Sequence, residues 1–252
     1  MELQRGLGGA PQQAVTRGEA LAIEPALAHA QVPIAGAIHT PSECAADCRK
    51  VCVGLADVLG KRGVRLAFGA TVQGFAQRGN RVAALRTDIG DIEADAFVLA
   101  AGTASAVLAR QLGIRLPLYP LKGYSATFDL PDGALAPRVS ITDSASKVVF
   151  ARLGQRLRVA GMAELVGDDA SIPASRIATL RSALDALFPQ CDAGEPQSPW
   201  TGMRPATPTG LPIVGRHPRG PANLVLNTGH GALGFTLAFG TGQQVRDELA
   251  HL

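Results

Sequence analysis

Two parts of the sequence carry residue types that could do chemistry, and the first is an arginine on a stiff segment. Arg204 is followed directly by Pro205, whose ring fixes the backbone at that point. A guanidinium group keeps its charge, and its fork of N–H donors matches both oxygens of a carboxylate. We therefore expect Arg204 to bind the carboxylate of a small molecule. The alternative is an arginine that braces a loop by donating to backbone carbonyl groups.

The second part is the glycine-rich bend Gly229-His-Gly-Ala-Leu-Gly234, which lies between an apolar run and a helical pattern. The bend has the form G-x-G-x-x-G, which is typical of a dinucleotide-binding βαβ unit. The sequence ends at Leu252, however, and shows neither the second strand nor the acidic residue that such a unit needs. Glycines still let the backbone approach a flat ligand, and a helix N-terminus offers free N–H groups. We expect the bend to seat a flavin ring rather than a diphosphate.

A similar strand, turn and helix pattern lies in the middle of the sequence. Residues 97–101 form a continuous apolar run, typical of a strand that is buried on both faces. Gly102 and Thr103 follow, and threonine is a residue type that caps helices. We expect Thr103 to cap a helix over residues 104–112, which Gly113 ends. The pattern indicates a second place where backbone can meet a ligand at the end of a strand.

The cysteines do not indicate a metal site. Cys44, Cys48 and Cys52 stand four apart, along one side of a helix, and the second close pair that zinc sites use is missing from the sequence. We interpret these three and Cys191 as small apolar core residues and predict no metal.

Acid–base groups are equally sparse. The sequence shows no Ser-His-Asp or paired-carboxylate arrangement. His230 either donates to a bound ring or bonds to loop backbone, and both interpretations stay open. We interpret Lys122 as a solvated or loop-bracing charge.

The composition describes an ordinary globular protein of 252 residues, 46% hydrophobic and 18% charged. A net charge of +3 with scattered basic residues argues against nucleic acid as a partner. The longest uncharged apolar run is too short to span a bilayer, and no signal peptide is visible. We expect a cytoplasmic protein, with peripheral attachment to the inner membrane face as an alternative.

The hydrophobic pattern predicts a mixed α/β chain. Helices are expected at residues 16–27, 42–62, 104–112, 173–188 and from about 236, and strands at 36–40, 64–68, 71–77, 81–87, 97–101, 118–127, 139–141, 147–151, 157–162 and 224–228. The helix at 42–62 carries an apolar stripe of 3.6-residue period, which we expect to face inward. The stripe consists of Cys48, Val51, Cys52, Leu55, Val58 and Leu59. Alternation over residues 115–201 favours an antiparallel sheet with one wet or ligand-facing side.

As a set, seven segments resemble the D-amino acid dehydrogenase branch of the FAD-dependent D-amino acid oxidase superfamily. The resemblance extends from about Glu19 to Leu252, and the order and spacing of the segments make the set specific. The segments are Glu24-Pro-Ala-Leu27, Asp47-Cys48, Val98-Leu-Ala-Ala-Gly102, Tyr119-Pro-Leu-Lys-Gly-Tyr-Ser125, Trp200-Thr-Gly-Met-Arg-Pro205, Pro212-Ile-Val-Gly215 and Asn227-Thr-Gly-His-Gly-Ala-Leu-Gly234. The resemblance implies an incomplete Rossmann-like FAD-binding domain, residues 40–114 and 205–252, interleaved with an antiparallel-sheet substrate domain. That substrate-binding domain would comprise residues 1–39 and 115–204.

The resemblance also implies roles for single residues. Arg204 would bind the substrate carboxylate, and Tyr124 and Tyr119 would lie on the substrate side of the flavin. Gly102 and Thr103 would approach the cofactor from the Rossmann side. The remaining residues implied to line the flavin ring are Gly229, His230, Gly231, Leu233, Gly234 and Thr236.

The implied reaction is oxidative deamination of D-amino acids to 2-oxo acids and ammonia, with electrons passed to a carrier such as a quinone. Members of this superfamily begin with a strand and a G-x-G-x-x-G helix that grip the FAD diphosphate, and this sequence shows neither. We expect either a partner chain that supplies this nucleotide lobe or an amino-terminally shortened product with weak FAD retention. Alternatives are a subunit of a glycine- or sarcosine-type amine oxidase and a non-catalytic remnant.

Overall fold

The computed structural model describes residues 9–252, which fall into two compact units. The first unit comprises the described residues up to 51 together with 123–163 and 170–202. The second comprises residues 52–122, 164–169 and 203–252. The Gly- and Gln-rich composition of residues 1–14 predicts a loose start. Residues 1–8 of this stretch lie outside the described residues, and residues 13–16 form a strand. The mixed α/β class expected from the sequence is confirmed.

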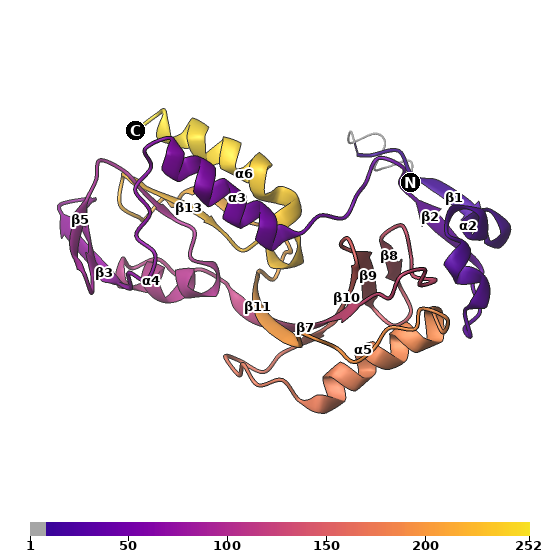
Figure 1. Cartoon of the computed structure of the whole chain (residues 1–252). Helices are drawn as coiled ribbons and strands as arrows, with labels where there is room; N and C mark the ends of the chain where they lie inside the picture. The colour runs from indigo at the N-terminus through magenta and orange to yellow at the C-terminus, as the bar shows by residue number, and fades with distance from the viewer. Residues whose placement is uncertain (1–8) are drawn as a thin grey trace. The chain divides into compact units, whose positions relative to one another are not determined.

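Most of the antiparallel structure belongs to the first unit (Figure 1). Its elements are β1 (Gln13–Thr16), α2 (Arg17–Ile23), the 3-10 helix η1 (Pro25–His29), β2 (Gly36–His39), β7 (Tyr119–Asp129), β8 (Ile141–Asp143), β9 (Val148–Arg152), β10 (Arg156–Glu164), α5 (Ala174–Leu187) and β11 (Trp200–Ala206). The five-stranded sheet has the order β11-β7-β10-β9-β8, and β7 and β11 each continue into the second unit. The antiparallel sheet predicted over residues 115–201 is confirmed.

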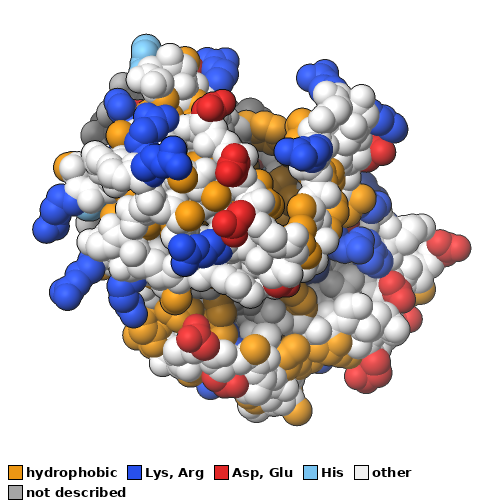
Figure 2. All heavy atoms as spheres, turned by 90° about the vertical axis from the view of Figure 1, so that its left-hand side faces the viewer, with side chains coloured by type: hydrophobic (Ala, Val, Ile, Leu, Met, Phe, Trp, Pro, Cys, Tyr) orange, Lys and Arg blue, Asp and Glu red, His pale blue; other side chains and the backbone are white. Residues whose placement is uncertain are grey.

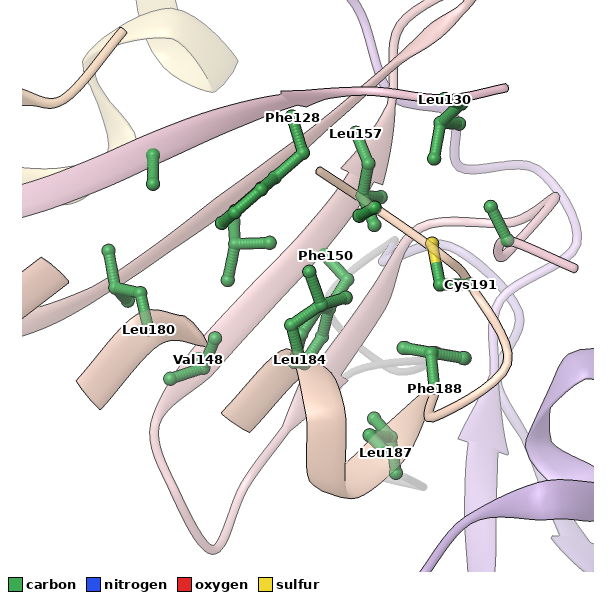
Figure 3. Packing of buried hydrophobic residues seen from close by; sticks show 14 of the residues in the cluster. Phe128, Leu130, Val148, Phe150, Leu157, Leu180, Leu184, Leu187, Phe188 and Cys191 are labelled. Carbon is green, nitrogen blue, oxygen red and sulfur yellow. The ribbon is translucent and has the colours of Figure 1, made fainter. Parts of the chain in front are cut away.

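Helix α5 covers one face of this sheet, and the main core lies between them (Figure 3). Leu180, Leu184 and Leu187 point inward at helical spacing, as the pattern predicts. Phe150 meets Phe188 edge to face, with ring centroids 5.2 Å apart. Because side chains alternate along a strand, the residues between these core positions lie on the opposite face of the sheet.

A buried carboxylate fastens the amino-terminal elements to the rest of the first unit. Glu24 is 2% exposed and accepts hydrogen bonds from the backbone N–H groups of Ala26, Arg138 and Val139. A buried charge is tolerated only when it is paired or hydrogen-bonded, so these donors are what hold Glu24 there.

The second unit contains two small sheets and the last helix (Figure 1). Its elements are the greater part of α3 (Cys48–Lys61), β3 (Val72–Arg78), β4 (Arg81–Thr87), β5 (Gly90–Glu93), β6 (Phe97–Leu99), η2 (Gly102–Ala104), α4 (Ser105–Gln111), β12 (Ile213–Arg216), β13 (Leu224–Thr228), η3 (Gly231–Leu233) and α6 (Gly234–Leu249). Strands β12, β13 and β6 form one sheet in that order, with β13 and β6 parallel. Both strands of that parallel pair therefore end at the same edge.

A buried asparagine ties the two sheets of this unit together. Asn223 is 1% exposed, accepts from the backbone N–H of Val82, and donates to the carbonyl oxygens of Val82 and Asp95. The backbone carbonyl oxygen of Asn223 accepts a hydrogen bond from the backbone N–H of Phe97 at 2.9 Å, where β6 begins. Asn223 thus sets β4 and β6 against the start of β13.

Helix α3 corrects the prediction of an inward-facing stripe. The helix exists, but it begins at Cys48 and has no buried residue. Leu55 and Val58 are 45% and 44% exposed. The core interpretation of Cys44, Cys48 and Cys52 is therefore wrong, because all three are exposed, whereas it is right for the buried Cys191. Amphipathicity indicates which face a partner would cover, and within the described residues no element buries that face.

Two strand predictions fail for a related reason. Residues 64–68 form no strand, and Phe68 is 82% exposed. Strand β6 is shorter than the predicted 97–101 and lies at the end of its sheet order. Its pattern is typical of a strand buried on both faces, but Val98 is 43% exposed, as expected where the nucleotide lobe is missing beside it. A parallel strand needs a hydrogen-bonded neighbour, and among the described residues β6 has one on one side only.

Other strands were not predicted because their sequences lack the alternation of polar and apolar residues that is typical of strands. The Pro- and Gly-rich residues 202–215 include the end of β11 and the start of β12. Strand β5, Gly90–Glu93, is too short and polar to show alternation.

Candidate functional site

Two glycine turns meet at the carboxyl edge of the parallel strands β6 and β13. Gly102 follows β6 and has a φ of +59°, and Gly229 follows β13 and has a φ of +80°. The hydroxyl of Thr228 donates to the carbonyl oxygen of Gly102 at 3.1 Å and joins the two turns. The two bends that the sequence indicates separately are therefore one feature. Left-handed backbone of this kind is readily adopted by glycine.

The bend at Gly229 is packed so closely that only hydrogen fits. A Cβ at this position would lie 2.8 Å from Cγ2 of Thr207 and 3.2 Å from Cδ2 of Leu118. Thr207 directly follows β11, and Leu118 directly precedes β7. The bend thus touches residues that directly flank these two strands, and both residues belong to the second unit.

The predicted carboxylate-binding arginine lies on the strand that leads to this contact. Arg204 lies on β11, three residues before Thr207, which is about 10 Å of extended chain. The side chain is half-buried, and burial lowers the pKa of the Arg204 guanidinium from its usual value. An arginine still carries its charge at neutral pH. A partly desolvated cation on a strand can hold an anion more tightly than one in open water.

His230 points its ring at the last helix. Nε2 of His230 lies 3.3 Å from Oγ1 of Thr241, and this hydroxyl donates to the carbonyl oxygen of Leu237. Because the hydroxyl has one proton, we assign the Nε2–H tautomer, with His230 as the donor. Burial lowers the pKa of His230, which favours the neutral ring. This hydrogen bond fastens the bend to a helix side chain. The role of His230 beside a flavin ring stays a prediction.

Helix α6 starts at Gly234, two residues before the predicted start. Its N-cap is Leu233, and within the described residues no side chain caps the helix. Gly231 has a φ of +55° with open space where a Cβ would stand, Leu233 is 51% exposed, and Thr236 is exposed in the first turn. Since no side chain among residues 9–252 caps this helix end, its amide groups suit a ligand with partial negative charge.

One residue that sequence reasoning left out of the site is Asn227 on β13. Its buried Oδ1 has no hydrogen-bond partner among the described residues. Buried polar atoms are almost always satisfied, so an orphan acceptor beside the bend suits a ligand that donates an N–H or O–H group. The sequence signal that could have indicated Asn227 is a polar residue that directly follows the apolar run Leu224-Val-Leu226.

Thr103 does not cap a helix. It lies within η2, and α4 begins at Ser105 with Ala104 as its N-cap. Ser105 has the local polar role instead, because its Oγ accepts from the N–H of Ala101 at 3.0 Å. Gly102 is open on its Cβ side, so backbone is accessible at this turn. The role of Thr103 beside the cofactor stays a prediction.

The two tyrosines lie in different units. Tyr119, 42% exposed, accepts on its hydroxyl a hydrogen bond from the N–H of Gly167 at 3.2 Å. Tyr124 is 2% exposed and packs in the core of the first unit. The proposed role of Tyr124 beside a ligand stays a prediction. Lys122, expected to be a solvated or loop charge, is fully buried and pairs with Asp169 at 3.2 Å, so it braces residues 164–169 but is not solvated.

The described residues give no sign of a metal centre, because no group of three or more His, Cys, Asp and Glu side chains in residues 9–252 is arranged to hold an ion. No helix among these residues is both long and apolar enough to cross a membrane. On the face shown in Figure 2, the Lys and Arg side chains are spread out, with Asp and Glu side chains among them.

The residues of the second unit therefore fit a flat ligand. Two left-handed glycine turns bring backbone to one edge, an uncapped helix offers amide groups, and Asn227 offers a buried acceptor. A flavin ring has a flat face, a ring N–H and carbonyl oxygens, and so matches this set.

Comparison with known proteins agrees with this fit. The family model described as "FAD dependent oxidoreductase" (DAO) matches residues 1–248. D-amino acid dehydrogenase 2 of Ralstonia nicotianae is 49% identical over 96% of this chain, and D-amino acid dehydrogenase 2 of Pseudomonas aeruginosa is 48% identical over 94%. The chain covers 59% and 56% of these two proteins, and so spans well under two thirds of their length.

Among solved structures, glycine oxidase from Geobacillus kaustophilus superposes with a TM-score of 0.88 at 28% identity, covering 99% of this chain and 65% of that one. L-proline dehydrogenase from P. horikoshii superposes with a TM-score of 0.86 at 18% identity, covering 98% of this chain and 66% of the other, which shows a shared fold alone.

Proposed function

Because this chain belongs to the DAO family of FAD-dependent oxidoreductases, we propose that it is the flavin-ring and substrate part of a D-amino acid dehydrogenase. The observation that supports the proposal most directly is the junction of two glycine turns by Thr228 and Gly102, beside the strand that carries Arg204. The two relatives named D-amino acid dehydrogenase 2 favour D-amino acids as substrates.

The residues that would hold FAD are those of the second unit. Gly102, Gly229 and Gly231 would lie against the ring, the first turn of α6 would donate N–H groups to it, and Asn227 would accept from it. Leu233, Gly234 and Thr236 would complete this seat. When bound, FAD supplies the acceptor for two electrons from the substrate.

The protein's share of the reaction is orientation. Arg204 would hold the substrate carboxylate by two parallel hydrogen bonds and so fix how the Cα–H bond faces the cofactor. Tyr119 would lie on the substrate side, and Tyr124 is the less accessible candidate for that side. The overall reaction would convert a D-amino acid and water to a 2-oxo acid and ammonia, and two electrons and two protons would pass to a carrier such as a quinone. No protein acid or base is needed, in line with the neutral His230.

We propose that the two domains have the functions that the resemblance implies. Residues 40–114 and 205–252 would bind FAD, and residues 1–39 and 115–204 would shape the substrate side. The protein would act in the cytoplasm, or attached to the inner membrane face where a quinone is reached. The exposed thiols of Cys44, Cys48 and Cys52 suit a reducing compartment.

A partner lobe would complete the cofactor site. The apolar face of α3, Phe68 and the free side of β6 are exposed in the second unit, and the relatives are longer than the part that this chain matches. A strand–turn–helix lobe could pair with β6 and cover these side chains while gripping the FAD diphosphate.

The test is dye reduction by the chain combined with FAD and the part of the Pseudomonas aeruginosa relative that it does not match. D-alanine should reduce the dye, and L-alanine should not. Arg204→Leu should lower kcat/KM by at least about a hundredfold, since two charge-assisted hydrogen bonds are lost at about 1.5–3 kcal/mol each. Arg204→Lys should fall between, because lysine keeps the charge without the fork. Full turnover by Arg204→Leu would remove this residue from the site.

The rival function is glycine- or sarcosine-type amine oxidation, which the superposition on glycine oxidase favours. The same arginine would bind the carboxylate of glycine. Turnover of glycine or sarcosine faster than of D-alanine in the same assay would select this function.

A further inference from the structure

A second arginine lies on the face of the five-stranded sheet opposite the α5 core, within the first unit. Leu157 and Val159 of β10 are buried in the core against α5, so Arg158 between them projects from the opposite face. The same alternation on β7 puts Tyr124 and Ala126 in the core and Ser125 on the face of Arg158.

Three neighbours fix where the Arg158 guanidinium stands. Its Nη2 donates to Oγ of Ser125 at 2.8 Å, and its carbon lies 5.7 Å from the centroid of the Trp200 ring. The Trp200 ring in turn lies over Gly202, where a Cβ would come within 2.1 Å of Cη2. The glycine makes room for the ring, and the ring holds the cation from one side.

Among residues 9–252, no acidic side chain forms an ion pair with this arginine. Among the described residues Arg181 also stacks on an aromatic ring, that of Phe128, but it donates to both carboxylate oxygens of Asp185 and to the carbonyl of Gly194. Arg158 is half-buried, and within residues 9–252 its only side-chain hydrogen bond goes to a neutral hydroxyl. A guanidinium has five N–H donors, so most of those of Arg158 are left for a ligand.

We propose that Arg158, held by Ser125 and Trp200, forms a binding site for the carboxylate of a small organic acid. Two parallel N–H donors match the two oxygens of a carboxylate, and Trp200, which is 54% exposed, leaves the site open to solvent. The site lies in the first unit, involves none of the residues assigned to the flavin ring, and goes beyond the proposed function.

Trp200 is the single tryptophan of the chain, so its fluorescence reports this site without any cofactor. The full chain is titrated with propionate, D-alanine and D-glutamate at constant ionic strength, and with D-alaninamide as a ligand that lacks a carboxylate. The three carboxylates should change the emission with saturation, and D-alaninamide should not. An equal saturating response to chloride or sulfate would overturn the proposal, because it would show a general anion effect.

The variants test which side chain is responsible. Arg158→Met should raise the half-saturating carboxylate concentration at least about tenfold, and Arg158→Lys should do so less. Arg181→Met, the matched stacked arginine, should leave it unchanged. Circular dichroism confirms that each variant is folded, and calorimetric titration of Arg158→Met measures binding independently of the altered Trp200 environment. The site is refuted if calorimetry gives Arg158→Met the carboxylate affinity of the wild-type protein. It is also refuted if the wild-type protein responds to no carboxylate. Both outcomes are independent of whether FAD binds to the second unit.

Discussion

The hydroxyl of Thr228 donates to the carbonyl oxygen of Gly102 at 3.1 Å, across 126 residues of sequence. Thr228 is 1% exposed, so Thr228→Val would leave the Gly102 carbonyl without this donor in a buried place. We expect a loss of about 1–3 kcal/mol in the free energy of unfolding, measured by urea denaturation, and weaker FAD binding measured by flavin fluorescence.

Thr228→Ser is the matched control, because it keeps the hydroxyl and loses only a methyl group, at a cost of about 0.8 kcal/mol. FAD binding should weaken less in the serine variant than in the valine variant. The opposite order would mean that packing, and not the hydrogen bond, holds the two turns together.

The three glycines of the final bend should respond differently to alanine. Gly229→Ala combines a φ of +80° with a 2.8 Å clash against Thr207 and should cost more than about 1–2 kcal/mol. Gly231→Ala has a φ of +55° but open space and should cost about 1 kcal/mol, while Gly234→Ala, at a φ of −54°, should leave unfolding nearly unchanged. Thermal melting ranks the three. If Gly231→Ala abolishes FAD binding while the fold persists, the backbone at that position contacts the ring.

The residues that sequence reasoning placed correctly are those whose positions depend on local chemistry. The strand before Gly229, the turn itself and the core face of α5 follow from apolar period and glycine placement, and all are observed. Asn227 and the Thr228 to Gly102 bond were missed, because a polar residue at a strand end gains its meaning from a neighbouring strand far away in sequence.

Two of the failures have the same physical source. The stripe of α3 and residues 64–68 have patterns that suit a covered face and a paired strand, but a pattern cannot tell whether the covering element is present. Burial of Lys122 was missed for the opposite reason. Its partner Asp169 is 47 residues away, and no local pattern links the two.

His230 predicts a pH dependence of stability. Burial lowers its pKa in the folded protein, whereas in the unfolded chain it titrates near the ordinary value of about 6.5. The unfolded state therefore binds the proton more readily, so the stability from neutral His230 is fully present above about pH 6.5 and is lost as the pH falls below it.

Urea unfolding at pH 7.5 and 5.5 measures this effect, and His230→Gln is the comparison, since glutamine keeps an N–H donor and does not titrate. The variant should lose less stability between the two pH values than the wild-type protein. Equal losses would assign the pH dependence to other groups.

The exposed side of β6 is where we expect the missing lobe to pair with this chain. Val98 is 43% exposed on a strand that pairs with β13 alone within the described chain, and a lysine there would hinder addition of another strand and its covering helix. Val98→Lys should raise the solubility of the isolated chain and reduce its gain in FAD affinity when the missing lobe is supplied. Val107→Lys, at a position on α4 that is 60% exposed, makes the same chemical change away from that edge and should leave the gain intact. Flavin fluorescence with and without the lobe measures the gain. If the lobe restores FAD binding equally in both variants, it docks elsewhere than on β6.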